Sequence, residues 1–514
     1  MSTDLRSHVS HLLDHNIEAG RGDQAAIITE GGDRVTYAEV YAQACRVAGH
    51  LRDDLGVRRE ERVLLVLDDT PAFHAAFLGA NRIGAVPVPV NILARSQDYA
   101  YYLDDSYATV AIVDATLLDK VTPHLDERPH VRLVVANTDD DPAGASSMDA
   151  WMADGIDELD AVPTHPDDPA FWLYSSGSTG NPKGVVHRQK DVLATCENFA
   201  GAVLGLQAGE VTFSTTKLFH AYGLGNGLTF AMWAGATAVQ MAGKPTPDKS
   251  LEKIETYRPS VLYSVPTLYN AMLNDERIDD RNLDSLRIGV SAAEALPPEV
   301  WRRWRKRTDT EILDGIGSTE MLHIYCANRP GQVKPGSSGV PVPGYELEIR
   351  GDDGHVLPAN EAGGLYVKGD SALAYYHHQN LKTRTAMHGH WFLTGDRYKR
   401  DEEGYYFYEG RLDDMMKVGG LWVSPIEIEN RLMEHEAVRE AAVVSTEMDD
   451  LTKIRAVVIL HPGTDGTDEL TAQLQEWCKD GLQRYQFPHV VDYVDDFPRT
   501  STGKIQRFKL RAEG

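Results

Sequence analysis

The sequence is poor in cysteine, and the spacing of its cysteines excludes two common kinds of site. Cys45, Cys196, Cys326 and Cys478 stand far apart with no C-x-x-C pair, and only His323 lies near one of them. This spacing predicts neither a zinc site nor a disulfide framework. We therefore interpret the four cysteines as reduced thiols in the core.

Long apolar segments and basic residues are also scarce. The N-terminus has no basic start followed by an apolar run, and no stretch of roughly 18 uninterrupted apolar residues occurs. The 51 Lys and Arg residues are outnumbered by 77 Asp and Glu residues, which gives a formal net charge of −26. A field of this sign repels nucleic acid and anionic membrane surfaces. We expect a cytoplasmic protein with no nucleic-acid partner and no integral membrane association.

The pattern of hydrophobic runs indicates several structural units of the α/β class. A chain of 514 residues exceeds what one hydrophobic core usually spans. Short β-branched runs at residues 62–67, 109–113 and 131–135 alternate with helical stretches such as residues 71–82. We predict a large N-terminal domain, residues 1–412, of parallel and mixed sheets with helices and a small β-rich subdomain. A small α+β domain, residues 413–514, follows it, with strands expected at residues 441–444 and 454–460.

Residues 174–187, YSSGSTGNPKGVVH, are the most informative stretch. Four Ser and Thr hydroxyls and two glycines crowd into the ten positions that end in Lys183. Small side chains and free backbone N–H groups allow close approach of a polyphosphate, and the hydroxyls and the ammonium supply donors. The stretch is not a Walker A loop, because Lys183 is followed by Gly and a strand-like VVH run. A flexible Ser/Gly turn between two strands is the alternative.

This stretch resembles the phosphate loop of the acyl-adenylate-forming superfamily, which contains acyl-CoA synthetases, luciferases and peptide-synthetase adenylation domains. The resemblance extends over nearly the whole chain and implies that ATP is a substrate. The residues that it assigns to the ATP phosphates are Ser175, Ser176, Gly177, Ser178, Thr179, Gly180 and Lys183.

Residues 314–320, DGIGSTE, look like the second core motif of the superfamily. The resemblance gives Thr319 the α-phosphate and Glu320 the Mg²⁺ ion, and a carboxylate that carries a hard cation beside phosphate oxygens is sound chemistry. Many members carry Tyr at the position of Ile316, so we expect adenine to lie against aliphatic and backbone surface. A Ser-Thr-Glu run alone could be a helix capping box. The further residues expected near the nucleotide are Ala293, Glu294, Asp314 and Gly315.

Three further sites nearer the C-terminus also match the superfamily. Asp396 and Arg411 match the ribose site, Asp413 matches the hinge of a mobile C-terminal domain, and Gly419 or Gly420 would admit the pantetheine arm of coenzyme A. Alone, a Gly-Asp pair is usually a turn and an exposed loop Asp means little.

Residues 498–507, PRTSTGKIQR, match the terminal motif whose lysine approaches both the attacking carboxylate and the α-phosphate. That lysine is Lys504 here, and its charge would stabilise the negative charge that grows at phosphorus. A basic chain end is otherwise an ordinary solvated tail. The resemblance assigns Lys504 to adenylation only.

The acid substrate is indicated by the segment 217–225, KLFHAYGLG. It has no Asp to pair with an α-ammonium group, which disfavours an amino acid, and it resembles the acid-binding motif in which His220 would help gate ATP and acid. GIGSTEMLHIY and KVGGLWVSPIEIE look like benzoate-CoA ligases. A flat pocket for a ring would then be walled by Ala221, Tyr222, Gly317, His323 and Ile324. His323 could equally be a structural residue that hydrogen-bonds the backbone.

The implied activity is an ATP-dependent aryl-CoA ligase that converts benzoate or a substituted benzoate, ATP and coenzyme A into aryl-CoA, AMP and pyrophosphate. A short-chain, medium-chain or alicyclic acyl-CoA synthetase is the alternative within enzymes. A non-catalytic nucleotide-binding regulatory protein is disfavoured by the presence of both Glu320 and Lys504. The ring substituents, the pathway and the choice between monomer and homodimer are not determined by the sequence.

Overall fold

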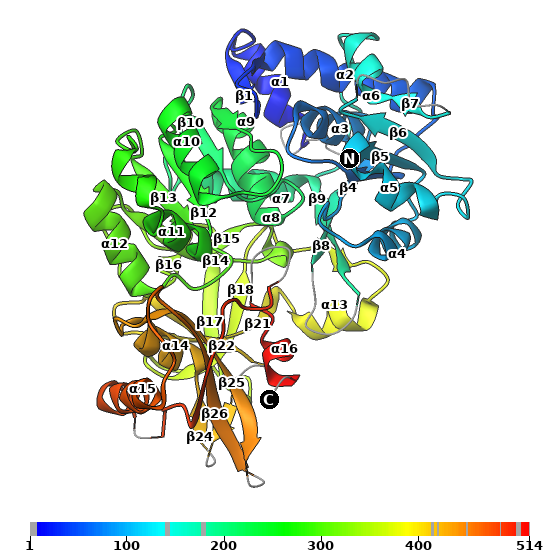
Figure 1. Cartoon of the computed structure of the whole chain (residues 1–514). Coiled ribbons are helices and arrows are strands. Elements are labelled where there is room, and N and C mark those ends of the chain that lie inside the picture. Colours follow the sequence, from blue (N-terminus) through cyan, green and yellow to red (C-terminus); the bar gives the residue numbers. More distant parts are fainter. Residues whose placement is uncertain are drawn as a thin grey trace.

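The computed structural model describes residues 8–138, 144–175, 181–412, 416–418, 421–448, 451–483, 485–499 and 505–512. Its mixed α/β architecture and smaller C-terminal unit confirm the predicted fold class. Figure 1 shows the first lobe in blue to cyan, the second lobe in green, and the C-terminal elements in orange to red at the opposite end. Within the described residues, no helix is long and apolar enough to cross a membrane.

The first lobe is built on a five-stranded parallel sheet with the order β4-β3-β5-β6-β7. The predicted strands and the predicted helix 71–82 are present within one or two residues, because continuous Val, Leu and Ile runs are what a doubly covered parallel sheet requires. The bounds are β3 Arg62–Val66, β4 Val86–Pro89, β5 Val110–Asp114, β6 Arg132–Ala136, β7 Ser146–Ser147, α1 His11–Glu18, α2 Tyr37–Asp53, α3 Pro71–Arg82, α4 Ser96–Ser106, α5 Leu118–Val121 and α6 Met148–Ala153.

The second lobe is built on a nine-stranded sheet with the order β16-β15-β14-β13-β12-β10-β11-β1-β2. Strands β10 to β14 run parallel to one another, so the segments that follow them leave the sheet at one edge, where α/β proteins commonly bind ligands. The strand bounds are β1 Ala25–Ile28, β2 Arg34–Thr36, β10 Val211–Ser214, β11 Thr237–Val239, β12 Val261–Ser264, β13 Ile288–Ser291, β14 Ile312–Gly317, β15 Ile324–Ala327 and β16 Val340–Pro341.

Short helices connect the strands of the second lobe and surround the carboxyl edge of its sheet. Two of them contain π-helical stretches, η4 Cys196–Gly201 and η5 Gly225–Thr229, and such stretches are frequent at functional sites. The remaining bounds are α7 Gln189–Thr195, α8 Ala221–Leu224, α9 Phe230–Ala234, α10 Pro247–Tyr257, α11 Pro266–Leu273, α12 Pro298–Thr308 and the 3-10 turn η7 Thr319–Met321.

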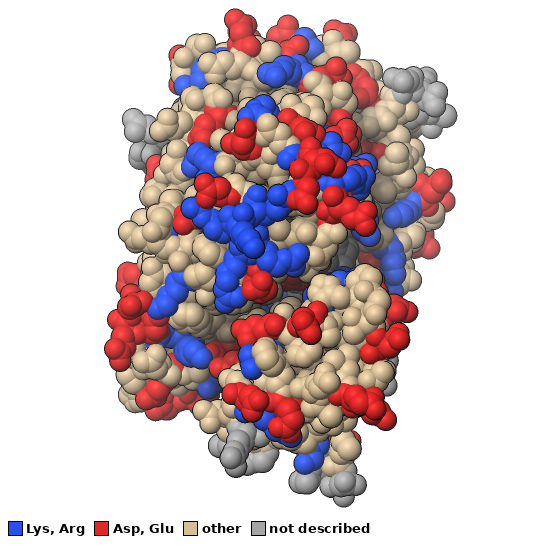
Figure 2. All heavy atoms as spheres, turned by 60° about the vertical axis from the view of Figure 1, so that its left-hand side comes forward, with Lys and Arg blue, Asp and Glu red and all other residues tan. Residues whose placement is uncertain are grey.

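Figure 2 turns the α12 side of the molecule forward and shows basic side chains gathered in a band on this face, with acidic side chains around it. Helix α12 carries Arg302, Arg303, Arg305, Lys306 and Arg307. Most of these cations face carboxylates, as Arg302 does with Glu299 at 2.7 Å. Three of the five cations on this helix therefore have a carboxylate partner within the protein.

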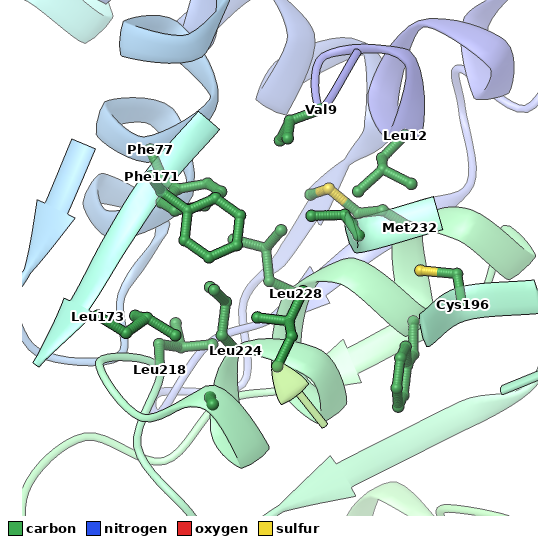
Figure 3. Packing of buried hydrophobic residues seen from close by; sticks show 14 of the residues in the cluster. Val9, Leu12, Phe77, Phe171, Leu173, Cys196, Leu218, Leu224, Leu228 and Met232 are labelled. Carbon is green, nitrogen blue, oxygen red and sulfur yellow. The ribbon is translucent and has the colours of Figure 1, made fainter. Parts of the chain in front are cut away.

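Between the lobes, a three-stranded sheet β19-β9-β8 carries the predicted phosphate loop. Its bounds are β8 Pro169–Ser175, β9 Lys183–Arg188 and β19 Tyr375–Tyr376. Figure 3 shows Phe171 of β8 beside Phe77 of α3, and Leu173 of β8 beside Leu218 of the second lobe, with Leu224 and Leu228 nearby. Burying a side chain of this size contributes about 1.5–3 kcal/mol, so this core fixes β8 against both lobes.

The predicted β-rich subdomain is a five-stranded antiparallel sheet. Its elements are β17 Glu346–Arg350, β18 Ala362–Lys368, β20 Met387–His388, β21 Trp391–Arg400, β22 Tyr406–Arg411 and, beside it, α13 Asn380–Ala386. The C-terminal unit contacts this sheet, because Lys399 Nζ lies 3.3 Å from a Glu427 oxygen and Ser424 Oγ donates to the Glu409 carbonyl at 2.6 Å.

The C-terminal unit has its own core around a three-stranded sheet, β25-β26-β27. Strands expected at residues 441–444 and 454–460 are longer in the structure and form one hairpin that continues into polar sequence. The bounds are β23 Met416–Val418, β24 Leu421–Val423, α14 Pro425–Met433, β25 Val438–Met448, β26 Leu451–Leu460, α15 Asp468–Gly481, β27 Val490–Tyr493 and α16 Arg507–Ala512.

Candidate active site

The phosphate-loop region begins and ends on a β-hairpin. Ser175, the last residue of β8, pairs in register with Lys183, the first residue of β9. Residues 176–180, which include the predicted Ser176, Gly177, Ser178, Thr179 and Gly180, lie outside the described residues. The pairing holds the two ends of the loop together, so Lys183 lies opposite the residue at which the loop starts.

Lys183 and Glu320 meet in the interior of the site. The Lys183 ammonium lies 3.6 Å from Oε1 of Glu320 and 4.7 Å from the centre of the Tyr376 ring. The same Oε1 atom accepts hydrogen bonds from Tyr376 Oη at 2.9 Å and from Ser175 Oγ at 3.3 Å. Lysine and carboxylate from distant segments are thus brought together, as the sequence motifs require.

The two charges respond differently to burial. Burial tends to raise the pKa of Glu320, but the Lys183 ammonium and the hydrogen bonds from Tyr376 and Ser175 outweigh it and hold this pKa below its ordinary value. For Lys183 burial dominates over the attraction of Glu320, and the pKa of the ammonium is lowered. The carboxylate is 8% exposed and ionised at neutral pH, which suits a group that carries a metal ion.

Thr319 and Glu320 lie on the turn η7, directly after the carboxyl end of β14. Ser318 caps this turn, since its side chain accepts a hydrogen bond from the Met321 N–H at 3.2 Å. The turn ends at Leu322, whose φ of 65° is unusual for a residue other than glycine. Backbone strain of this kind clusters at functional sites.

His323 lies at the centre of an aromatic cage in the second lobe. Its ring centre is 4.4 Å from that of Phe230, 5.3 Å from Phe199 and 5.4 Å from Tyr222. Its Nε2 atom contacts Oδ1 of Asn226 at 3.1 Å. Burial lowers the pKa of His323 to about 3, so the imidazole is neutral over the physiological range.

Of the residues predicted to wall the acid pocket, Tyr222 and His323 belong to this cage, and Ala221 and Ile324 are their neighbours in the chain. Tyr222 directs its hydroxyl to the carbonyls of Ser264 and Val290, at 3.3 and 3.1 Å, and so is anchored to the edge of the sheet. Ala221 and Ile324 are buried. Gly317 lies directly on the backbone of the next segment, because a Cβ atom there would stand 2.6 Å from the His323 carbonyl oxygen.

A buried ion pair anchors the acid-binding segment. Lys217 Nζ donates to Asp68 Oδ1 at 2.7 Å and to the Met241 carbonyl at 2.6 Å. Asp69 accepts from the Leu218 N–H at 3.0 Å, and burial raises its pKa to about 7. His220, three residues after Lys217, is the N-cap residue of α8, and its ring centre lies 4.2 Å from that of Phe219.

The predicted adenine residues lie on two adjacent strands. Ala293, just after β13, has a φ of 79°. The carboxyl of Asp314 accepts from the Leu296 N–H at 3.4 Å and so supports that loop, while burial raises its pKa to about 8. Ile316 is half-buried at the end of β14, without an aromatic ring at its position.

Two further predicted nucleotide residues have local structural contacts. A Cβ atom on Gly315 would stand 2.8 Å from the Cys326 carbonyl oxygen, so only glycine fits between β14 and β15. Glu294 accepts a hydrogen bond from Thr267 Oγ1 at 2.9 Å. The two residues therefore border the region where Ala293 and Ile316 lie.

The predicted ribose residues form an ion pair. Asp396 and Arg411 are direct partners in the β21–β22 register, and their side chains meet at 2.9 Å. Glu320 also contributes to the raised pKa of Arg411, after the opposing effect of burial and the larger attraction of Asp396. The pair therefore belongs to the same site as Lys183 and Glu320.

The sequence analysis missed several side chains of this site. Tyr376 is brought to Glu320 by β19, and nothing in its local sequence distinguishes it from a core tyrosine. Asn226 follows Tyr222 by four residues on one helical segment, which is the one signal that could have placed it beside His323. Four predicted residues, Lys504, Asp413, Gly419 and Gly420, lie outside the described residues.

Comparison with known proteins agrees with this geometry. Residues 13–377 match the family described as AMP-binding enzyme, and residues 427–504 match the AMP-binding enzyme C-terminal domain. A benzoate--CoA ligase of Thauera aromatica is 46% identical over 504 residues, which are 98% of this chain and 95% of that protein.

Solved structures give the same result. The structure of a benzoate CoA ligase from Burkholderia xenovorans LB400 has a TM-score of 0.91 and 43% identity, and covers 98% of this chain and 99% of its own. The anthranilate CoA ligase AuaEII in complex with anthranoyl-AMP has a TM-score of 0.94 and 37% identity, with 98% and 97% covered. The chain therefore belongs to the AMP-binding enzyme family, the acyl-adenylate-forming superfamily, and resembles its aryl-CoA ligases.

Proposed function

We propose that this protein is an ATP-dependent ligase that joins benzoate, or a small substituted benzoate, to coenzyme A through an acyl-adenylate. The observation that carries the choice of acid is the cage around His323. A neutral imidazole among three aromatic rings, bordered by Ala221 and Ile324, offers flat apolar faces and no buried charge. Such a surface fits an aromatic ring whose carboxylate points toward phosphorus. The names of the relatives favour the same acid class.

In the first half-reaction, a carboxylate oxygen of the acid attacks the α-phosphorus of ATP and pyrophosphate leaves. We assign the ATP phosphates to Ser175–Gly180 and Lys183, the α-phosphate to Thr319, and the ribose to Asp396 and Arg411. Ala293, Glu294 and residues 314–316 would border adenine. Lys504 would stabilise the charge that grows between the reacting groups.

Glu320 is the residue that we assign to Mg²⁺. Within the described residues, no group of three or more His, Cys, Asp or Glu side chains could hold a metal ion. A single ionised carboxylate beside a phosphate-binding strand fits Mg²⁺, which proteins bind through one or two carboxylates and the phosphates of the substrate. The ion would neutralise charge on the phosphate oxygens.

In the second half-reaction, the thiol of coenzyme A attacks the carbonyl carbon of the adenylate, and AMP leaves. This acyl transfer needs no nucleophilic side chain, and every cysteine is buried, so none is assigned a part. We assign domains to residues 1–412 and 413–514, with Asp413 as the hinge between them. Gly419 and Gly420 would line the path of the thiol arm, and His220 would gate access of acid and ATP.

The test is acid-dependent release of pyrophosphate from ATP over benzoate, hydroxybenzoates, cinnamate, phenylacetate, cyclohexane carboxylate and hexanoate. We expect benzoate or a substituted benzoate to give the highest kcat/KM. A higher kcat/KM for hexanoate than for every aromatic acid would refute the aryl assignment. No release with any acid would refute the enzymatic assignment.

A further inference from the structure

The turn η7 is too short to hold its own position. It has three residues, begins at the end of β14 and ends at the strained Leu322. A single 3-10 turn has poor hydrogen-bond geometry and little cooperativity, so its place is set by neighbouring segments. Thr319 and Glu320 both lie on it, and what holds the turn therefore sets the position of both side chains.

Two of its three carbonyls are held by the segment that leads into β19. The Glu320 carbonyl accepts from the Leu373 N–H at 2.7 Å, and the Met321 carbonyl accepts from Ser371 Oγ at 2.7 Å. These contacts fix the turn to the β19 side of the small three-stranded sheet.

The remaining carbonyl, that of Thr319, is held by a histidine on the phosphate-binding strand. His187 Nε2 lies 2.8 Å from this oxygen. Lys183 and His187 are four residues apart on β9, and side chains at even separations share one face of a strand. One face of β9 thus meets the turn twice, through Lys183 on the Glu320 carboxylate and through His187 on the backbone of Thr319.

The other ring nitrogen of His187 meets a carboxylate. Nδ1 lies 3.2 Å from Oδ2 of Asp191, and both side chains are fully buried. Asp191 also accepts from the backbone N–H of Arg188 at 2.9 Å and from its Nε at 3.0 Å. Arg188 therefore helps to hold the Asp191 carboxylate in place beside the His187 ring.

Both partners of the imidazole are therefore acceptors. The Thr319 carbonyl can only accept, so Nε2 of His187 carries the proton that it donates, while Nδ1 faces the Asp191 carboxylate. The Nε2 donor of His187 thus faces the Thr319 carbonyl, and Asp191 contacts the opposite side of the His187 ring.

We propose that His187, held by Asp191, is a positioning residue that sets the Thr319–Glu320 turn in register with the phosphate-binding strand. The inference rests on the proposed roles of Thr319 and Glu320 in adenylation. His187 itself touches backbone and not substrate. Loss of its Nε2 donor leaves the Thr319 carbonyl with the Leu322 N–H of its own turn, at 3.1 Å, but without its partner on β9, and lets the turn shift relative to Lys183.

Two amide substitutions separate the two ends of the ring. In His187→Gln the side-chain amide can reach the place of Nε2 and donate to the Thr319 carbonyl, whereas in His187→Asn it reaches only the place of Nδ1. We expect His187→Asn to lower kcat for benzoate-dependent pyrophosphate release by about 10–100-fold, because a misplacement near 1 Å can cost about 100-fold. KM for ATP should change less, and His187→Gln should restore kcat to within about fivefold of the parent protein.

Matched variants separate positioning from general destabilisation. Thr310→Val removes a buried hydroxyl that donates to the Leu286 carbonyl at 3.1 Å, at the end of β14 opposite to the turn, and should lower the Tm while leaving kcat within twofold. Equal kcat in the Gln and Asn variants, or losses of kcat that simply follow Tm across all variants, would overturn the inference. Should His187→Asn not fold, Asp191→Asn carries the test. A kcat at least about fivefold lower supports the inference, and an unchanged kcat overturns it.

A further variant, Thr319→Ala, distinguishes failure of this inference from failure of the proposed roles. If Thr319→Ala loses adenylation while His187→Asn keeps it, only the positioning role is wrong. If Thr319→Ala keeps the full rate, the assignment of this turn to the α-phosphate is wrong, and the inference falls with it.

Discussion

Replacing Gly225 by alanine should weaken binding of the acid by pushing the His323 ring. A Cβ atom at Gly225 would stand 2.4 Å from Cδ2 and 2.7 Å from Nε2 of His323, where carbon atoms normally approach to about 3.5–4.0 Å. The ring must move by about 1 Å, and its aromatic neighbours Phe199, Tyr222 and Phe230 leave it little room.

Two opposing contributions set the size of the change in benzoate binding that Gly225→Ala should cause. Overpacking of a buried site costs about 1–3 kcal/mol, while alanine in a helical position recovers up to about 1 kcal/mol relative to glycine. Gly225 has helical dihedral angles, so backbone strain adds nothing. A net displacement cost of about 1.4 kcal/mol on the acid-binding side corresponds to about a tenfold higher KM for benzoate.

The assay is initial-rate pyrophosphate release with varied benzoate at saturating ATP, followed by varied ATP at saturating benzoate. We expect KM for ATP to stay within twofold. Gly364→Ala in β18 is the matched control, because its Cβ would meet Leu393 at an ordinary 3.5 Å. An unchanged benzoate KM in a folded Gly225→Ala protein would refute the assignment of the His323 cage to the acid.

Four further outcomes are expected. Tyr376→Phe removes a donor to Oε1 of Glu320 and should lower the rate of adenylation about 5–20-fold, measured as pyrophosphate release. Asp396→Asn should raise KM for ATP about 10–100-fold with a smaller change in KM for benzoate, because a charged acceptor for the ribose hydroxyls is lost; equal changes in both would contradict the ribose assignment. Burial lowers the pKa of His323 from 6.5 to about 3, so the unfolded chain binds this proton more readily, and the free energy of unfolding falls as pH falls below 6.5. The free energy of unfolding, measured by denaturation at pH 5, 6 and 7, should therefore depend on pH more steeply in the parent protein than in His323→Gln, by up to about 1.4 kcal/mol per pH unit. Parallel slopes would be inconsistent with a buried neutral ring. Lys504→Ala should abolish adenylation yet still convert supplied benzoyl-adenylate to the thioester, and equal loss of both half-reactions would contradict alternation about the hinge.

Much of the fold was predictable because hydrophobic period and strand composition are local properties. The strands at residues 62–67 and 109–113 and the helix at residues 71–82 consist of residues whose burial on both faces is visible in the sequence. The hairpin β25–β26 was predicted too short, because its last pairs, such as Thr446 with Lys453, are polar and held by cross-strand backbone hydrogen bonds.

The sequence by itself determined which chemical groups are present: a Ser/Gly loop with Lys183, the Thr319–Glu320 pair, the Asp396 and Arg411 stations, and an acid segment without a counter-charge for an amino group. The chemistry of these groups depends on residue type and spacing, and both can be read from the sequence. Only the tertiary structure decided which distant groups meet. Tyr376 reaches Glu320, Asn226 and Phe230 enclose His323, and His187 meets the Thr319 carbonyl across more than a hundred residues of chain. Such contacts depend on the register of strands and the packing of lobes, which no local pattern encodes.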